Sequence, residues 1–421
     1  MFKKTTLRNG LRVITVPQEV TQAVTALVLV GTGSKYETKK NNGISHFLEH
    51  MYFKGTEKRP TPLAVIEPLD KIGAIYNAFT SEEYTGYFAK VEFSHIDLAL
   101  DWISDIYLNS LLPPKEIEKE RKVIIEEMNM YLDMPMLYVG ELWKKLLYGD
   151  QPAGWEVIGT KENIINISRQ QILSYMKSQY VAANTIVCLA GKFSKADIIS
   201  KIKKYFLKIH TADFKNKFPV IEKQSKPQTL LYFKKTDQTH LTLGVRAYNL
   251  FHPQRYAQEI LGVILGGMMS SRLFVEIRQK LGMAYYIKTN AHSDPDAGYL
   301  VTQAGIDNKN VERATSIILR EYKKISQKRI SAKELKKAKE YIKGKTTLEL
   351  ESSDAQAAFF ASQELLENRI LTPEEIYKKI DKVSQNDTLK VARDVFRPEK
   401  LNLALIGPFK DKNKFQKLLK L

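Results

Sequence analysis

Short apolar runs alternate with longer amphipathic stretches along the chain. In the first half, four segments rich in apolar, β-branched and aromatic residues are predicted strands. They are residues 5–16, 23–31, 75–80 and 84–91. Asn9-Gly10 is a turn signal, and residues 94–109 and 115–132 have the spacing of amphipathic helices. The pattern therefore predicts a chain in which strands and helices are mixed.

The second half of the chain repeats the first. Residues 167–193 align with residues 383–409 without a gap. Matched pairs include Ser168 with Ser384, Leu173 with Leu389, Tyr180 with Phe396, Gly191 with Gly407, and Phe193 with Phe409. A constant offset over this length predicts two duplicated domains. We place them at residues 1–210 and 229–421, and interpret the polar, lysine-rich stretch 211–228, which contains two prolines, as a linker.

Composition and charge argue against a nucleic-acid-binding protein. The chain has 421 residues and a formal net charge of +18. Its lysines alternate with glutamates, as in residues 116–127, which indicates a solvated surface rather than a nucleic-acid partner. The single cysteine, Cys188, lies in an apolar run and is expected to pack as a small buried side chain.

The same features predict the compartment. One cysteine allows no disulfide within the chain, which fits a reducing compartment. Residues 1–17 lack the apolar core of a signal peptide. No stretch approaches the roughly 18 apolar residues of a spanning helix. We therefore expect a cytoplasmic protein without a membrane partner.

The segment His46-Phe47-Leu48-Glu49-His50 carries the candidate chemistry. Histidines four residues apart share one face of a helix, where two imidazoles can bind one metal ion. Glu49 is a carboxylate beside them that can take a proton from water without being a ligand. The order H-x-x-E-H is the reverse of the zinc-protease motif H-E-x-x-H. Ser45 precedes the first histidine and is a candidate helix cap.

A third ligand is expected from the helix that begins near residue 115. A carboxylate there would leave one coordination position open for water, as catalytic zinc requires. Spacing alone leaves Glu120, Glu126 and Glu127 as alternatives. In the second half, Lys333-Glu334-Leu335 matches Lys115-Glu116-Ile117 in a neighbouring register. In that register Ala338 stands opposite Glu120 and Lys345 opposite Glu127. The second half therefore keeps the fold and lacks the metal site.

Several motifs in a fixed order carry a resemblance to a known family. They are Gly43 to Met51, Phe53-Lys54-Gly55-Thr56, Asn77 to Ser81, Glu120-Arg121, Val123 to Glu127, Ser270 to Phe274, Ile277-Arg278 with Tyr285, Pro373-Glu374-Glu375, and Ile406-Gly407-Pro408. With these motifs the chain resembles the pitrilysin family, peptidase M16, in the branch of mitochondrial processing peptidase and its bacterial homologues. The resemblance covers nearly the whole chain.

The resemblance implies both a fold and a set of roles. The fold is α+β, with two homologous αβ domains, each a mainly antiparallel sheet faced by helices, that together form a half-shell. One Zn²⁺ per subunit would be held by His46, His50 and Glu127. Glu49 matches the general base, and Glu120 matches a supporting glutamate near the metal. Asn77, Ala78 and Phe79 match a strand that holds and pockets the substrate.

The resemblance also implies a function and an assembly. The leading hypothesis is a zinc endopeptidase that cleaves unfolded peptides in an enclosed chamber. The alternative is a non-catalytic structural subunit, such as the core subunits of a respiratory complex, but such members lose ligands that this chain retains. Arg278 and Tyr285 match residues that contact substrate from the half opposite the zinc. Because the chain has one such half, we expect a homodimer with a shared active site.

Overall fold

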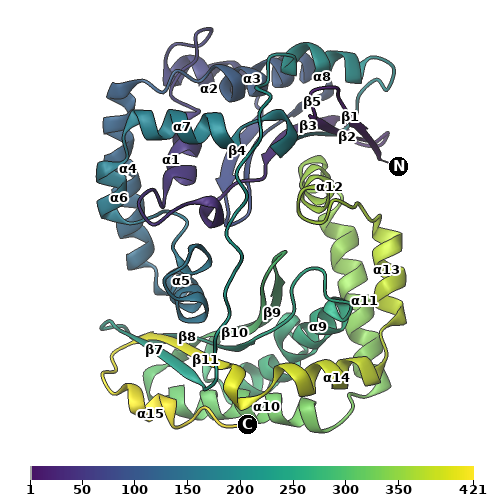
Figure 1. Ribbon diagram of the computed structural model, residues 1–421. Coiled ribbons are helices and arrows are strands. Elements are labelled where there is room, and N and C mark those ends of the chain that lie inside the picture. The colour runs from purple at the N-terminus through teal and green to yellow at the C-terminus, as the bar shows by residue number, and fades with distance from the viewer. Residues whose placement is uncertain (1) are drawn as a thin grey trace. The chain divides into compact units, whose positions relative to one another are not determined.

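The computed structural model describes residues 2–421, which form two compact units (Figure 1). Among the described residues, unit 1 comprises residues 2–129, 155–218 and 348–370. Unit 2 comprises residues 130–154, 219–347 and 371–421. Each unit contains one sheet with helices packed on it, so the predicted α+β class, with two mainly antiparallel sheets faced by helices, is confirmed.

The sheet of unit 1 has the strand order β1-β2-β6-β3-β5-β4. Its strands are β1 (Lys3–Thr6), β2 (Arg12–Pro17), β3 (Ala23–Val30), β4 (Ile75–Thr80), β5 (Thr85–Glu92) and β6 (Thr185–Gly191). Among the described strands of this sheet, only β2 and β6 pair in parallel. Central β3 is almost continuously buried because α3 (Ile96–Asn109) packs on it and α12 (Ser353–Glu367) adds a second apolar layer over Leu27 and Leu29. Strand β4 lies at the edge of the sheet.

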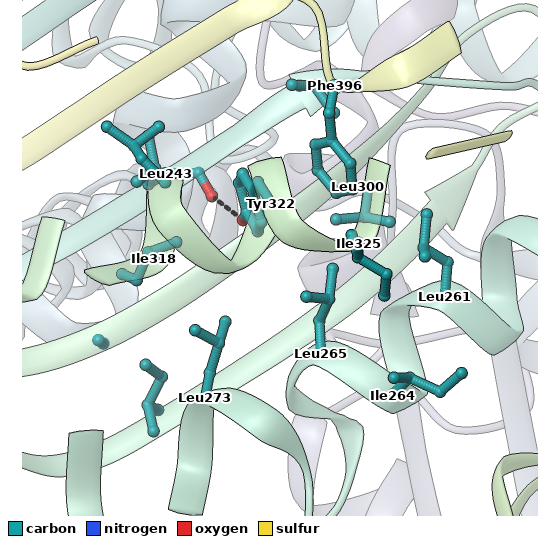
Figure 2. Close-up of a cluster of buried hydrophobic side chains, with 14 of the residues drawn as sticks. Leu243, Leu261, Ile264, Leu265, Leu273, Leu300, Ile318, Tyr322, Ile325 and Phe396 are labelled. Carbon is teal, nitrogen blue, oxygen red and sulfur yellow. Dashed lines mark hydrogen bonds between the residues drawn. The ribbon is translucent and has the colours of Figure 1, made fainter. Parts of the chain in front are cut away.

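The sheet of unit 2, with the strand order β7-β11-β8-β10-β9, repeats the part β2-β6-β3-β5-β4 of the first sheet. Its strands are β7 (Gln228–Phe233), β8 (Gln238–Arg246), β9 (Ala284–Ser293), β10 (Gly298–Asp307) and β11 (Leu401–Gly407). The one parallel pair is β7 with β11, which matches β2 with β6. Figure 2 shows the apolar core of this unit, where the Tyr322 hydroxyl donates to the carbonyl oxygen of Leu243 at 3.0 Å.

The remaining helices are divided between the two units, and α4 corresponds to the helix predicted at residues 115–132. Unit 1 contains α1 (Ile44–Met51), α2 (Pro62–Asp70), most of α4 (Pro114–Asp133), α6 (Lys161–Asn166), α7 (Arg169–Gln179) and α8 (Ile198–Phe206). Unit 2 contains α5 (Pro135–Tyr148), α9 (Arg255–Gly262), α10 (Val311–Gln327), most of α11 (Ala332–Glu349), α13 (Pro373–Lys382), α14 (Gln385–Val395) and α15 (Lys412–Gln416). Two π-helical segments, η5 (Val263–Gly267) and η6 (Phe274–Lys280), follow α9.

The repeat seen in the sequence corresponds to a repeat of structure. Helices α7 and α14 both begin with a capping box, on Ser168 and Ser384 respectively. Each helix is followed by a short 3₁₀ turn and then by a fully buried strand, β6 or β11, at the same offset. Cys188 is buried in β6, as predicted.

Each half contributes one helix to the other half's compact unit. Helix α5 of the first half packs on β11 and β8 of unit 2, and α12 of the second half packs on β3 and β6 of unit 1. The compact units therefore do not follow the chain linearly. The boundaries at residues 210 and 229 remain a prediction about the duplicated halves, and one crossing between units, after residue 218, lies inside the predicted linker.

Candidate metal centre

Helix α1 places His46, Glu49 and His50 together. Ile44, Phe47, Leu48 and Met51 are fully buried and fix one side of the helix in the core of unit 1. The two histidines lie on the other side, with ring centroids 4.6 Å apart. The four-residue spacing thus brings the imidazoles together, as predicted.

The prediction that Ser45 caps this helix is wrong. The N-cap is Gly43, with a left-handed φ of 98° and no side-chain cap, and Ser45 is buried inside the first turn. The backbone N–H groups of Gly43 and Ser45 donate instead to the carboxylate of Glu37, each at 2.8 Å. A glutamate six residues upstream therefore takes the place of a local cap.

Glu127 on α4 meets both histidines. Its Oε2 lies 3.6 Å from Nε2 of His46 and 3.6 Å from Nε2 of His50. One ligand atom from each of the three residues lies within 4.8 Å of the others. Two donors bound tetrahedrally to Zn²⁺ at about 2.0–2.1 Å are separated by about 3.4 Å, so this His₂Glu set fits zinc. Glu126 is exposed and lies outside the group.

Glu120 supports the group without joining it. Its Oε2 accepts a hydrogen bond from Nδ1 of His50 at 3.0 Å, and its Oε1 accepts one from Nζ of Lys54 at 2.6 Å. Burial alone would raise the pKa of Glu120, but these two donors outweigh it and the pKa falls. An ionised carboxylate on Nδ1 leaves Nε2 of His50 directed at the ligand position.

Glu49 is half-buried next to the ligand group. Burial raises the pKa of its carboxyl group, and this rise is opposed by a hydrogen bond from Oγ1 of Thr80 at 2.5 Å. A carboxylate with a raised pKa is a better proton acceptor at neutral pH. Thr80 is the last residue of β4, so the edge strand holds this side chain in place.

The two histidines titrate differently. Burial, followed by the nearby His50, lowers the pKa of His46 to about 4, so this imidazole is neutral. Burial also acts to lower the pKa of His50, but the hydrogen bond to Glu120 and the nearby carboxylate of Glu127 outweigh it and raise the pKa to about 9. Metal ligation requires the neutral imidazole, so zinc would have to displace a proton from His50.

Strand β4 carries the three predicted substrate residues along a sheet edge. It pairs only with β5 in the sheet, in a register that runs from Ile75 opposite Lys90 to Thr80 opposite Thr85. Asn77 is exposed, whereas Ala78 and Phe79 are half-buried. The backbone on the other side of β4 is therefore available for pairing with an extended peptide.

Phe79 lines a pocket of about 280 Å³ within unit 1. Its ring lies over Gly86, where an added Cβ would come within 2.2 Å of the ring. The other walls are mainly apolar: Leu29, Tyr84, Glu349, Leu350, Ala355, Ala358, Phe359 and Ser362. Phe79 is thus a pocket residue on the face that α12 covers rather than a fully buried core aromatic.

Arg278 and Tyr285 lie together in unit 2, whereas the ligand group lies in unit 1. The Arg278 guanidinium lies 5.7 Å from the centroid of the Tyr285 ring and 5.0 Å from that of Phe274. Tyr285 is 74% exposed, so it is not a core tyrosine. Arg278 lies in segment η6, just before β9, and Tyr285 lies on β9, which is the edge strand of the second sheet.

Sequence reasoning gave no role to three residues that support the site: Lys54, Thr80 and Glu37. Lys54 and Thr80 lie inside motifs that the sequence singled out, and they contact Glu120 and Glu49. No local sequence pattern marks Glu37 as a cap for α1, because the path of the loop after Glu37 determines which N–H groups its carboxylate reaches. Side-chain contacts of this kind depend on tertiary structure.

Comparisons with known proteins give the family. Residues 12–161 match the family described as insulinase (peptidase family M16), and residues 166–342 match the peptidase M16 inactive domain. The chain is 34% identical to an uncharacterized zinc protease, YmxG, of Bacillus subtilis (strain 168), over 97% of this chain and 98% of that one. The chain belongs to peptidase family M16.

Solved structures share the whole fold. The crystal structure of a protease from Helicobacter pylori matches with a TM-score of 0.90 and 25% identity, over 97% of this chain and 99% of that one. A chain of Complex III2 from Candida albicans matches with a TM-score of 0.85 and 21% identity over the full length of both, which is a likeness of fold. Among residues 2–421, the helices are too short or too polar to cross a membrane.

Proposed function

We propose that this chain is a zinc-dependent endopeptidase acting on unfolded peptides. The observation that carries the proposal is the convergence of His46, His50 and Glu127, with the non-ligand carboxylate of Glu49 on the same helix as the two histidines. Three protein ligands leave a fourth position open, which distinguishes a catalytic zinc site from a structural one. The zinc-protease names of relatives support the same conclusion.

One Zn²⁺ per chain would be held by Nε2 of His46, Nε2 of His50 and the carboxylate of Glu127. When bound, zinc supplies Lewis-acid chemistry, lowering the pKa of water toward neutrality and stabilising negative charge on the scissile carbonyl oxygen. Glu120 and Lys54 orient His50 through its Nδ1. This outer contact fixes which imidazole nitrogen carries the hydrogen.

Glu49 performs the proton transfers. Its carboxylate accepts a proton from the attacking water and delivers it to the nitrogen of the leaving amine. The hydrogen bond from Thr80 to Oε2 holds one carboxylate oxygen and leaves Oε1 for this work. Because burial raises the pKa of Glu49, the side chain suits both steps near neutral pH.

Strand β4 binds the substrate by backbone pairing. An extended peptide added at the unpaired edge would bond to the backbone of Asn77, Ala78 and Phe79 whatever its sequence. The pocket beside Phe79 would accept an apolar side chain. Such binding tolerates many sequences but requires an unfolded chain, because a folded substrate cannot present a free strand.

The site is completed by a second copy of the chain. Arg278 and Tyr285 present a cation and a phenol on the surface of unit 2, and both groups can polarise a carbonyl or hold a peptide backbone. A two-fold homodimer around an enclosed chamber would supply this pair to the zinc site of the partner.

Metal removal tests the proposed function. We expect the zinc-loaded protein to cleave an unstructured fluorogenic peptide, to lose this activity to background on treatment with a chelator, and to regain it with one equivalent of Zn²⁺ per chain. A stably folded protein containing the same peptide sequence should remain uncut. Undiminished cleavage by protein shown to be free of metal would overturn the proposal.

A further inference from the structure

Glu37 is a fully buried carboxylate to which the proposed chemistry gives no role. It follows the 3₁₀ turn η1 (Ser34–Tyr36) and has no exposed surface. Its Oε1 accepts the N–H of Ser45 at 2.8 Å, and its Oε2 accepts the N–H of Gly43 at 2.8 Å and the side-chain amide of Asn42 at 2.9 Å. Its carboxylate therefore accepts three N–H groups at the start of α1.

This arrangement replaces a cap that the local sequence cannot provide. The first N–H groups of a helix have no partner within it and require an acceptor. Gly43 stands at the N-cap with φ of 98°, and a Cβ there would come within 2.8 Å of the carbonyl oxygen of Ile158. No side chain fits at this position, so the acceptor comes from Glu37. A carboxylate also interacts favourably with the positive end of the helix dipole.

The loop that carries Glu37 also contacts the turn that directly follows strand β4. The N–H of Ser34 donates to the carbonyl oxygen of Ser81 at 3.2 Å, and the N–H of Lys35 donates to that of Glu82 at 3.0 Å. Gly33 approaches so closely that a Cβ would lie 2.1 Å from the oxygen of Ser81. Ser81 directly follows Thr80, the partner of Glu49. Residues 33–37 therefore fix α1 and the end of β4 to the same short loop.

We propose that Glu37 is a positioning residue for the zinc site. By holding the N–H of Ser45, it fixes the first turn of α1 and thereby directs the next residue, His46, toward His50 and Glu127. A second hydrogen bond, between Oγ of Ser45 and the hydroxyl of Tyr175 at 2.7 Å, anchors the same turn from α7. The inference rests on the proposed zinc site and adds a residue that determines its affinity.

Glu37→Gln tests the role with little change of shape. The amide oxygen can replace one acceptor, but the NH₂ group would face the N–H groups that the second oxygen accepts now. We expect Zn²⁺ affinity, measured by competition with a chromophoric chelator, to fall about 10–100-fold. The visible spectrum of the Co²⁺-substituted protein should also change, because the ligand geometry at His46 is altered.

Glu364→Gln is the matched control. Glu364 is also a buried carboxylate of unit 1, but it lies on α12 and binds Lys4 and Arg12 rather than α1. This control should lose thermal stability and keep wild-type Zn²⁺ affinity and Co²⁺ spectrum. If Glu37→Gln is insoluble, Glu37→Asp takes its place, since its shorter side chain keeps the charge but withdraws the acceptors, and it should also weaken Zn²⁺ binding.

Two failures are distinguishable. If the wild-type protein binds no Zn²⁺, the proposed function itself is contradicted. If the wild type binds Zn²⁺ and the Glu37 variant binds it equally well with an unchanged Co²⁺ spectrum, Glu37 only stabilises the fold and the positioning role is overturned.

Discussion

Glu49→Gln should lower the rate of peptide cleavage about 10²–10⁴-fold while leaving the bound zinc in place. Glutamine has nearly the shape of glutamate and can still accept the hydrogen bond from Thr80 through its amide oxygen. It cannot accept a proton from water at neutral pH. The loss should therefore fall on kcat, measured with a fluorogenic peptide at saturating concentration.

The unchanged metal content separates this effect from damage to the site. Glu49 is not one of the three residues whose ligand atoms converge. Zinc per chain and the unfolding temperature of Glu49→Gln should therefore match the wild type. A variant that retains zinc and cleaves at the wild-type rate would show that another group is the base.

Two inactive variants should restore activity when they are mixed. Subunits carrying Glu49→Gln keep Tyr285, and subunits carrying Tyr285→Phe keep Glu49. If Tyr285 acts on the partner's zinc site, a mixed dimer contains one site with both wild-type residues. After complete random exchange, half of the dimers are mixed and half of their sites are whole, so roughly one quarter of wild-type activity should return.

Tyr285→Phe is a suitable variant because the substitution removes only one hydroxyl group. Tyr285 is 74% exposed, so this loss leaves the core of unit 2 intact. Exchange is followed independently, with donor and acceptor fluorophores on the two variants. If exchange is complete, both parents are inactive and no activity returns, the shared site does not exist as proposed.

Local and repeated patterns made the fold predictable from the sequence. The spacing of His46 and His50 requires only that α1 be a helix, and the capping residues Ser168 and Ser384 begin equivalent helices at a constant offset. Segments rich in apolar, β-branched and aromatic residues likewise predicted β4 and β5 near their observed bounds. Each of these inferences depends on residues close together in the chain, where physical constraints are strongest.

Long-range contacts explain what the sequence could not provide. Ser45 had the local signature of a helix cap, but Glu37 takes that role. The loop after Glu37 brings its carboxylate against the backbone N–H of Ser45 at the start of α1. The exchange of α5 and α12 between the compact units depends on long-range packing, of α5 on β8 and β11 and of α12 on β3 and β6. Spacing alone likewise left three glutamates of α4 as alternatives, because it does not set the rotation of that helix relative to α1, and only the family resemblance selected Glu127.

Zinc content of two adjacent variants tests the central claim most directly. Glu126→Gln and Glu127→Gln make the same chemical change at neighbouring positions of α4, but only Glu127 meets the two histidines. In dialysed protein, measured by mass spectrometry of the metal, the wild type and Glu126→Gln should hold one zinc per chain and Glu127→Gln should hold far less. Full zinc in Glu127→Gln, or loss of zinc in Glu126→Gln, would contradict the assignment of the site.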